Sequence, residues 1–439
     1  MADLRRIRLD RDGLITQDGR GQMRRYGLAV PGVEAVKRDP NGVLPVIGAE
    51  LGWPPEFFSG GGMAVALEVA DDATECLSRP LRIYYGIEPH CNLYCVGCGP
   101  RDFRHARTPV SPGFEDFLLQ EMARAGTFQV QLTGGEIALR GPDLFRTLDA
   151  TRSLGLAVIL ATNGEWSHLD HPDDFAEELA RYENIIQTNI SIDGSLELHE
   201  RIRGAGTYAK TLQTLERLAR AGLHPRITST IFKSTCNRKE LEHLVELALR
   251  YKAALQVIPV RLTGRASGHR DVMPTREGLF EYTRHASQLR SQTGVALSFN
   301  FDIFEGSRQI PIFDLHRPPS CGAPLWGVHV THTGEVYPCG FVQAANGNGA
   351  LLAGKVSERN GLLEIWLDSE VLQRVRSAGK SAACQACEDY GRGCWGGCWV
   401  AAWVETGELN GMDPYCIKHP GGAPLGSRQQ HKAEPFAII

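Results

Sequence analysis

The chain has 439 residues, of which 42% are hydrophobic, and its formal net charge is -4. This length is enough to bury a large core in two or three domains. The small net charge and the lack of a long Lys/Arg run exclude a general nucleic-acid binder, so we expect no nucleic-acid partner.

The first residues, MADLRRIRLDRDG, are charged and contain no apolar stretch of the kind found in secretory signals. No segment approaches the roughly 18 uninterrupted apolar residues of a membrane-spanning helix. We therefore expect a cytoplasmic protein with no membrane partner. Residues 1–80 are Gly-rich and broken, and we predict a small N-terminal extension there, with hairpins at most.

From residue 81 onward, short apolar runs alternate with stretches that carry apolar residues at helical spacing. Several of these helices end in Gly, as in RSLG and ARAG, which suits a helix C-cap. Repeated strand–helix units predict an α/β fold with a parallel sheet, either doubly wound or a full or partial barrel. The predicted strands are 81–88, 128–134, 156–163, 184–194, 226–234 and 254–262, and the predicted helices are 114–125, 143–155, 173–182, 209–222 and 238–251.

The segments that follow these strands carry the residues suited to chemistry. Ligands bind at the carboxyl ends of the strands in parallel α/β folds, so we expect one functional face there. In chain order, the candidates on this face are Cys91, Cys95 and Cys98, then Gly134, Gly135 and Glu136, then Asn163, then Ser191 and Asp193, and finally Cys236.

The first three cysteines stand in the spacing C-x3-C-x2-C on one short loop. Soft thiolates suit iron, and a [4Fe–4S] cluster has four corners, so three cysteines leave one iron open to an outside ligand. Half of a structural zinc site is the competing interpretation. It is weakened because the other clustered cysteines lie more than 200 residues away.

The segment CNLYCVGC resembles the signature of the radical S-adenosylmethionine (radical SAM) enzymes. In that family, S-adenosyl-L-methionine chelates the fourth iron. The turn LTGGEIAL resembles the family's glycine-rich turn, which meets the amino group of the cofactor. SIDG matches the end of the fourth strand, and Arg203 corresponds to an arginine that binds the cofactor carboxylate. The resemblance implies that the cofactor is bound by Gly134, Gly135, Glu136, Asn163, Ser191, Asp193 and Arg203. The resemblance covers roughly residues 81–265 and implies a partial (β/α)6 TIM-like barrel.

The C-terminal cysteines are similar to those of a SPASM domain, an extension that carries auxiliary clusters. The segment CQACEDYGRGCWGGC has six residues where five are usual in the middle of the pattern. The resemblance implies that Cys384, Cys387, Cys394 and Cys416 form one complete ligand set. It assigns Cys321, Cys339 and Cys398 to a second cluster with one ligand unassigned. Two zinc ribbons are the alternative.

Together these resemblances imply three [4Fe–4S] clusters. They divide the chain into the extension 1–80, the barrel 81–305, the SPASM domain 306–420 and a tail 421–439. Outside the one helix expected near 361–377, we predict few regular elements after about residue 306. Of the two solitary cysteines, Cys76 is expected to be an ordinary small side chain. Cys236 is either a residue that lines its loop or a hydrogen-atom donor to a substrate radical.

The implied chemistry is cleavage of S-adenosylmethionine to a 5′-deoxyadenosyl radical that abstracts hydrogen from the substrate. An electron donor such as flavodoxin or ferredoxin is expected. We favour a peptide-modifying maturase that oxidises or crosslinks its substrate, although residues 1–80 do not show the strand-and-helix pattern of a leader-binding winged helix. The alternatives are a dehydrogenase or epimerase of a small polar metabolite, such as an aminocyclitol or sugar, and a non-catalytic electron-transfer protein.

Overall fold

The fold is that of a computed structural model. It describes residues 4–10, 13–18, 23–27, 35–50, 58, 67–69, 77–99, 111–299, 323–345, 351–390, 394, 396–416 and 418.

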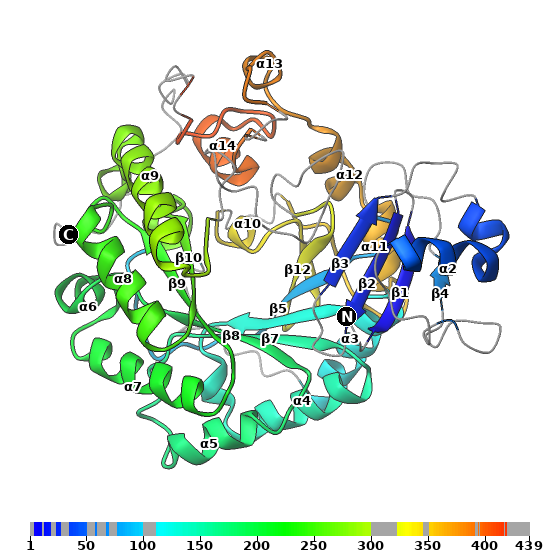
Figure 1. The fold of residues 1–439 in the computed structure, drawn as a ribbon, viewed down its shortest axis with the longest axis horizontal. Coiled ribbons are helices and arrows are strands. Elements are labelled where there is room, and N and C mark those ends of the chain that lie inside the picture. Colours follow the sequence, from blue (N-terminus) through cyan, green and yellow to red (C-terminus); the bar gives the residue numbers. More distant parts are fainter. Residues whose placement is uncertain are drawn as a thin grey trace.

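A ten-stranded sheet forms the centre of the molecule, in the order β11-β10-β9-β8-β7-β6-β5-β12-β13-β14 (Figure 1). The six predicted strands are all present, and neighbours among them pair in parallel. Among the described residues the sheet is open at both edges, as expected of a partial barrel. Its strands are β5 (Arg82–Glu88), β6 (Gln129–Gly134), β7 (Ala157–Thr162), β8 (Ile185–Ser191), β9 (Pro225–Ile231), β10 (Ala254–Pro259), β11 (Leu297–Phe299), β12 (Gly327–Thr331), β13 (Glu335–Tyr337) and β14 (Gly354–Lys355).

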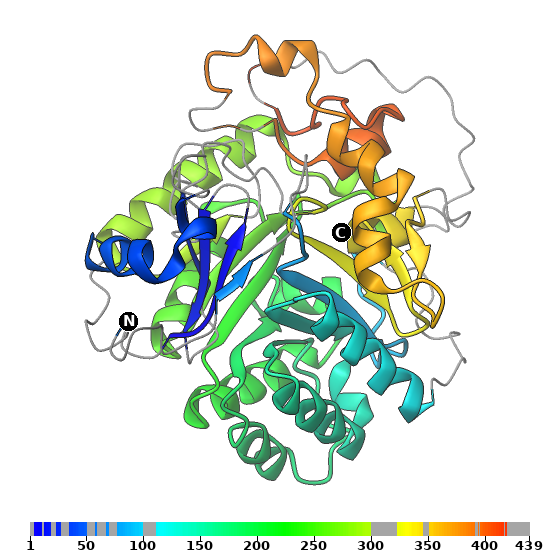
Figure 2. The same cartoon turned by 90° about the vertical axis from the view of Figure 1, so that its right-hand side faces the viewer.

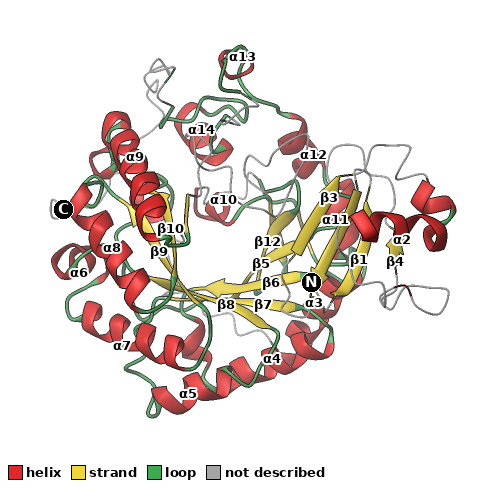
Figure 3. Ribbon diagram, viewed as in Figure 1, coloured by secondary structure: helices red, strands yellow, loops and turns green. Residues whose placement is uncertain are grey.

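Helices cover the outer face of this sheet (Figure 3). The apolar side chains of each helix recur every three or four residues and so lie on one face, as in α8, which buries Leu241, Leu244, Val245 and Ala248. These side chains pack on strand residues such as Ile227 and form the main core. The helices are α3 (Pro112–Arg124), α4 (Pro142–Ser153), α5 (Pro172–Leu179), α6 (Leu196–Arg203), α7 (Thr207–Arg220), α8 (Arg238–Arg250) and α9 (Arg276–Thr293).

The inner face of the same strands is different in composition. Polar side chains alternate with the core residues and are only partly buried, as Gln187 and Asn189 are on β8 and Thr228 and Thr230 are on β9. Strand periodicity places these residues opposite the helices. The concave side of the sheet therefore presents hydrogen-bonding groups.

The expectation of few regular elements after residue 306 is wrong. Strand β12 pairs in parallel with β5 and so extends the barrel sheet, and β13 and β14 follow it as antiparallel neighbours. The single helix predicted near 361–377 is divided at Ser369, whose hydroxyl caps the second half. The helices of this region are α10 (Gly340–Ala345), α11 (Leu362–Asp368), α12 (Glu370–Ser377), α13 (Ala382–Gln385) and α14 (Trp399–Thr406).

The N-terminal residues form a second sheet of four strands, in the order β3-β2-β1-β4. The hairpins were predicted, but the helix α2 and the strand β4 that follows it were not. The helix α2 contains Gly42, Pro45 and Gly48, which are poor helix formers, so its sequence conceals it. The elements are β1 (Leu4–Asp10), β2 (Gly13–Asp18), β3 (Met23–Gly27), α2 (Pro40–Glu50) and β4 (Leu67–Val69).

This small sheet docks at the amino ends of β5 and β6, on the flank of the central sheet away from the C-terminal helices (Figure 2). The buried guanidinium of Arg8 donates to the carbonyl of Gly126 at 3.1 Å. Arg6 lies 4.0 Å from the ring centroid of Phe128. Because these contacts lie before the strands begin, the small sheet is at the opposite end of the barrel from the predicted functional face.

Candidate functional site

The loop after β5 brings the first three predicted cysteines together. Burial raises the pKa of Cys91 to about 11 and that of Cys98 to about 12, and the charges of neighbouring thiols act in the same direction. The pKa of Cys95 is also raised by burial. Thiolates must therefore be stabilised by a bound cation, and the irons of a cluster are suitable because each thiolate binds a different corner.

Among the described residues, no group of three or more His, Cys, Asp or Glu side chains is arranged so that it could hold a single metal ion. A cluster imposes a different requirement, because its protein ligands are spread over separate irons. The donor set of three partly buried thiols on one loop is consistent with such a group.

Glycines allow the neighbouring turns to touch the cysteine loop through backbone atoms. A Cβ on Gly135 would lie 1.8 Å from the carbonyl oxygen of His90, and one on Gly134 would lie 2.3 Å from that of Glu88. The Gly135 amide donates to the Glu88 carbonyl at 2.7 Å. Only glycine fits such an approach. The predicted contact of this turn with the cofactor amino group stays a prediction, and the structure shows that the turn also supports the loop.

Glu136 connects the turns that follow β6 and β7. Its carboxylate is fully buried and accepts hydrogen bonds from the amides of Ala138 (3.1 Å) and Asn163 (2.6 Å) and from the hydroxyl of Thr162 (2.7 Å). Burial raises the pKa of Glu136, while these donors lower it. The carboxylate thus holds the Asn163 turn in place, and its predicted role as a cofactor ligand stays a prediction.

The side chain of Asn163 faces the cysteine loop. Its amide nitrogen lies 3.7 Å from the Cys91 sulfur and donates to Asn92 at 2.8 Å. Asn92 donates in turn to Glu165, which accepts from Lys210 at 2.8 Å. A chain of polar contacts therefore leads from helix α7 to the Cys91 thiol, so Asn163 is placed to orient the Cys91 side chain.

Asp193 and Arg203 form a buried ion pair beside the same loop. The Arg203 Nε donates to Asp193 at 2.7 Å, and its Nη1 lies 4.0 Å from the Cys95 sulfur. Burial alone lowers the pKa of Arg203, but the charges of Asp193 and Cys95 outweigh it and raise the pKa. The second Asp193 oxygen accepts from the Thr230 amide at 2.6 Å. The pair joins α6, β9 and the cysteine loop, while Ser191 ends β8 on the inner face, partly exposed.

Cys236 lies in the turn between β9 and α8, where its amide donates to the Phe232 carbonyl at 2.8 Å. The thiol is close to helix α9, 3.9 Å from the Cβ position of Gly278. Burial raises the pKa of Cys236 to about 12, so the thiol keeps its hydrogen at neutral pH. Its role as a hydrogen-atom donor stays a prediction.

Four C-terminal cysteines line one open cavity. They are the set predicted to hold a complete cluster, namely Cys384, Cys387, Cys394 and Cys416. Gly397 and Asp413 line the same cavity, and the Gly397 conformation (φ 66°) places a hypothetical Cβ 2.5 Å from Asp413. The cavity therefore brings four thiols together at one place, which suits an iron–sulfur cluster with four protein ligands.

The other auxiliary cysteines are described in part. Cys339 and Cys398 both pack against the apolar cluster that contains Tyr337 and Trp399. Cys321 lies outside the described residues, as does Cys76.

The sequence reasoning missed the charged residues that join the barrel to these cysteines. Arg261, in the loop after β10, is 5% exposed; burial lowers its pKa, but the nearby Cys398 and Asp413 outweigh burial and raise it. Asp413 accepts from the amides of Cys398 (2.6 Å) and Tyr415 (2.8 Å). The signal was weak: the segment PVRLTGR places two arginines just past a strand, but their partners are distant in the chain.

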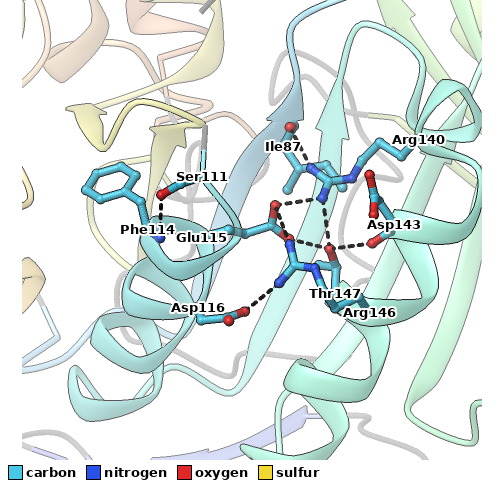
Figure 4. Close-up of polar contacts among 9 residues, drawn as sticks. All are labelled: Ile87, Ser111, Phe114, Glu115, Asp116, Arg140, Asp143, Arg146 and Thr147. Carbon is cyan, nitrogen blue, oxygen red and sulfur yellow. Dashed lines mark hydrogen bonds and ion pairs between the residues drawn. The ribbon is translucent and has the colours of Figure 1, made fainter. Parts of the chain in front are cut away.

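A second polar network supports the strand that leads into the cysteine loop (Figure 4). Arg140 donates to the Ile87 carbonyl at 3.1 Å and to Glu115 at 2.7 Å. Arg146 binds Asp116 at 2.7 Å, and Thr147 donates to Glu115. Helices α3 and α4 are thereby fastened to the carboxyl end of β5.

Comparison with known proteins identifies two families along this chain. Residues 87–248 match the radical SAM superfamily, and residues 321–389 match the SPASM family of iron–sulfur cluster-binding domains. The mycofactocin maturase MftC of Mycolicibacterium smegmatis is 27% identical over 371 residues, which cover 82% of this chain and 88% of that protein. The AdoMet-dependent heme synthase of Methanosarcina barkeri is 29% identical over 375 residues, covering 78% and 98%.

A solved structure, that of Streptococcus suis SuiB bound to its precursor peptide SuiA, shares the fold with a TM-score of 0.68 at 17% identity. The superposition covers 95% of this chain and 99% of SuiB. Within the described part of this chain, no helix is long and apolar enough to span a membrane.

Proposed function

Because this chain belongs to the radical SAM superfamily and carries a C-terminal SPASM domain, we propose that it is a maturase that oxidises or crosslinks a peptide. The alignment with the mycofactocin maturase carries this proposal, because it extends over 82% of this chain and 88% of that protein. Similarity over the barrel alone would leave the substrate class open.

The N-terminal sheet adds a structural argument. Strand β3 lies at the edge of the four-stranded sheet and has no further strand beside it among the described residues. A free edge can pair with an extended peptide through backbone hydrogen bonds. This mode of binding suits a peptide substrate and has no counterpart for a small metabolite.

The residues of the site would have distinct roles in binding the cluster and the cofactor. Cys91, Cys95 and Cys98 would hold the first cluster. When bound, this cluster and S-adenosylmethionine would supply one-electron chemistry that ends in hydrogen abstraction from the substrate. Arg203, fixed by Asp193, would bind the cofactor carboxylate. Glu136 would hold the turn that contacts the cofactor.

The C-terminal cysteines would hold two auxiliary clusters that accept an electron from the substrate. This gives three [4Fe–4S] clusters in all. The first would take its electron from a flavodoxin or ferredoxin. A soluble donor of this kind is consistent with the proposed cytoplasmic location.

The relationship to a heme synthase favours a second candidate, an oxidation of a small molecule rather than a peptide. Epimerisation is a separate outcome that would need a hydrogen donor such as Cys236. A reaction in deuterated water tests it, because the thiol exchanges with solvent. Solvent deuterium in the product, lost in Cys236→Ala, would establish epimerisation. Normal product at a normal rate from Cys236→Ala would remove Cys236 from the mechanism.

The experiment that tests the main proposal uses anaerobically reconstituted protein, S-adenosylmethionine, dithionite and synthetic peptides encoded by short reading frames beside the gene. A maturase should form 5′-deoxyadenosine in proportion to a peptide that has lost hydrogens, as measured by mass spectrometry. Cofactor cleavage without change in any of these peptides, but with oxidation of a small molecule from the same cell extract, would refute the peptide assignment.

A further inference from the structure

Two arginines lie on the inner face of the barrel sheet and form no ion pair with a carboxylate of the described residues. Arg226, on β9, alternates with Ile227 and Ile231, which belong to the main core, so its side chain points to the concave side. Arg82 begins β5, where it alternates with the core residues Ile83 and Tyr85 in the same way.

Curvature of the sheet brings these two strands together. Strands β9 and β5 are separated by β8, β7 and β6, which would place them about 19 Å apart in a flat sheet. Burial lowers the pKa of Arg226 to about 10, and the charge of Arg82 contributes to the same shift. Strand alternation places both side chains on the concave side, and the influence of Arg82 on this pKa indicates that the two guanidinium groups lie near each other there.

Neither cation is neutralised by the described residues. The Nε of Arg226 is buried and has no hydrogen-bond partner. The charged groups that act on Arg226 are Arg82 and Tyr84, with no carboxylate among them. Arg82 donates to the side-chain oxygen of Gln129, a neutral group, at 3.0 Å through Nε. A partly buried cation without a counter-charge is unfavourable, so an anion from outside the described chain would be bound favourably here.

We propose that Arg226 and Arg82 form a binding site for a carboxylate group of the substrate. The planar guanidinium group presents paired donors that match the two oxygens of a carboxylate. The inner surface of β7 and β8 nearby carries the apolar cluster of Ala157, Ile159 and Ile186, which adds no competing charge.

The depth of this site limits where the substrate reacts. Thr230, whose amide binds Asp193 beside the cysteine loop, lies four residues beyond Arg226 on the same face, or about 13 Å along β9. An extended peptide advances about 3.3 to 3.6 Å per residue. A peptide held at the arginines thus places within reach of the cofactor a C–H bond about four residues or fewer from its carboxylate.

The inference rests on the proposed function only in assigning the carboxylate to a peptide. Its test is a binding measurement that requires no turnover. The full-length, cluster-loaded protein is titrated by calorimetry with three probes. These are N-acetylglycine, with a terminal carboxylate, N-acetylaspartic acid α-amide, with a side-chain carboxylate, and N-acetylglycinamide, with none.

At least one acid should bind more tightly than N-acetylglycinamide, and the better acid shows whether a chain end or a side chain is recognised. Arg226→Gln should weaken that binding by about 10- to 100-fold, the range for a lost charge-assisted hydrogen bond. Arg359→Gln, at an exposed position outside the barrel, is the control and should bind as wild type does. Equal affinity for acids and amide, or unchanged acid binding in Arg226→Gln, would overturn the proposal.

Thermal unfolding gives an independent result. Because Arg226 has no counter-charge in the described protein, Arg226→Met should raise the melting temperature, whereas Arg359→Met should not. A lower melting temperature for Arg226→Met would show that Arg226 has a structural role instead. If the acids bind as expected while no peptide is modified, the carboxylate site stands and the peptide assignment fails.

Discussion

The ion pair between Asp193 and Arg203 provides a sharp test of how the cysteine loop is held. The Asp193 side chain is 1% exposed and that of Arg203 is 12% exposed, so neither charge is well hydrated. Replacing Asp193 by Ala leaves a buried guanidinium without a partner. A loss of about 3 to 5 kcal/mol in the free energy of unfolding is expected for such a change. The Thr230 amide also loses its acceptor, which adds to the cost.

The double variant Asp193→Ala/Arg203→Leu distinguishes charge imbalance from a simple loss of contacts. Because it removes both charges, it should be more stable than Asp193→Ala alone. Helix α6 also provides a matched control: Arg201 and Glu197 form an exposed pair, 51% and 73% accessible, and Glu197→Ala should cost only about 0.2 to 1 kcal/mol.

The assay is anaerobic urea unfolding followed by circular dichroism, with hydrogen exchange in α6 as a local measure. Binding of S-adenosylmethionine, measured in parallel, should fall as far in Asp193→Ala as in Arg203→Leu. If Asp193→Ala costs no more than Glu197→Ala, or if the double variant loses the sum of both single changes, the pair does not hold the loop as described.

Three further outcomes are expected. Gly135→Ala should prevent cluster binding, seen as loss of the iron–sulfur absorbance, because its Cβ would overlap the His90 carbonyl, whereas Gly113→Ala, with nothing within 4 Å, should load normally. Wild-type protein should hold about twelve irons, and the triple variant Cys91→Ala/Cys95→Ala/Cys98→Ala should hold about eight. An iron content of about four in the wild type, together with bound zinc, would refute the auxiliary clusters. Burial lowers the pKa of His329 in the folded protein to about 4. As the pH falls, the unfolded state therefore gains a proton on this side chain before the folded state does. The stability of the cluster-free protein should thus fall as the pH drops from about 6.5 towards 4. His329→Gln should reduce this acid sensitivity, and an unchanged pH profile would contradict it.

The barrel strands could be predicted because the apolar or alternating pattern within each strand indicates by itself that the strand is buried. The runs at 156–163 and 226–234 are apolar or alternate regularly, and glycines mark the ends of the preceding helices. Helices α6 and α9 were missed because they carry few apolar residues: α6 buries only His199 and Ile202. Their stability comes from tertiary contacts, which periodicity does not reveal.

The cysteine loop was visible in the sequence for a similar reason: all three thiols lie within eight residues, so their spacing alone is informative. The proximity of Arg261 to Cys398 and of Arg203 to Cys95 depends on segments that meet only in the folded chain. The same holds for Arg226 and Arg82, which no local pattern connects. Long-range charge pairing was therefore the part that the sequence did not reveal.

The pairing of β12 with β5 affects the order in which the protein can fold as it is synthesised. Strand β5 ends at residue 88, and its partner at 327–331 leaves the ribosome after most of the chain has been made. Until then, one edge of the growing sheet has unpaired backbone groups, and such edges promote aggregation. A chain that ends before residue 327 should therefore be aggregation-prone even though all six barrel strands are present, and chaperones should bind the nascent protein during this interval.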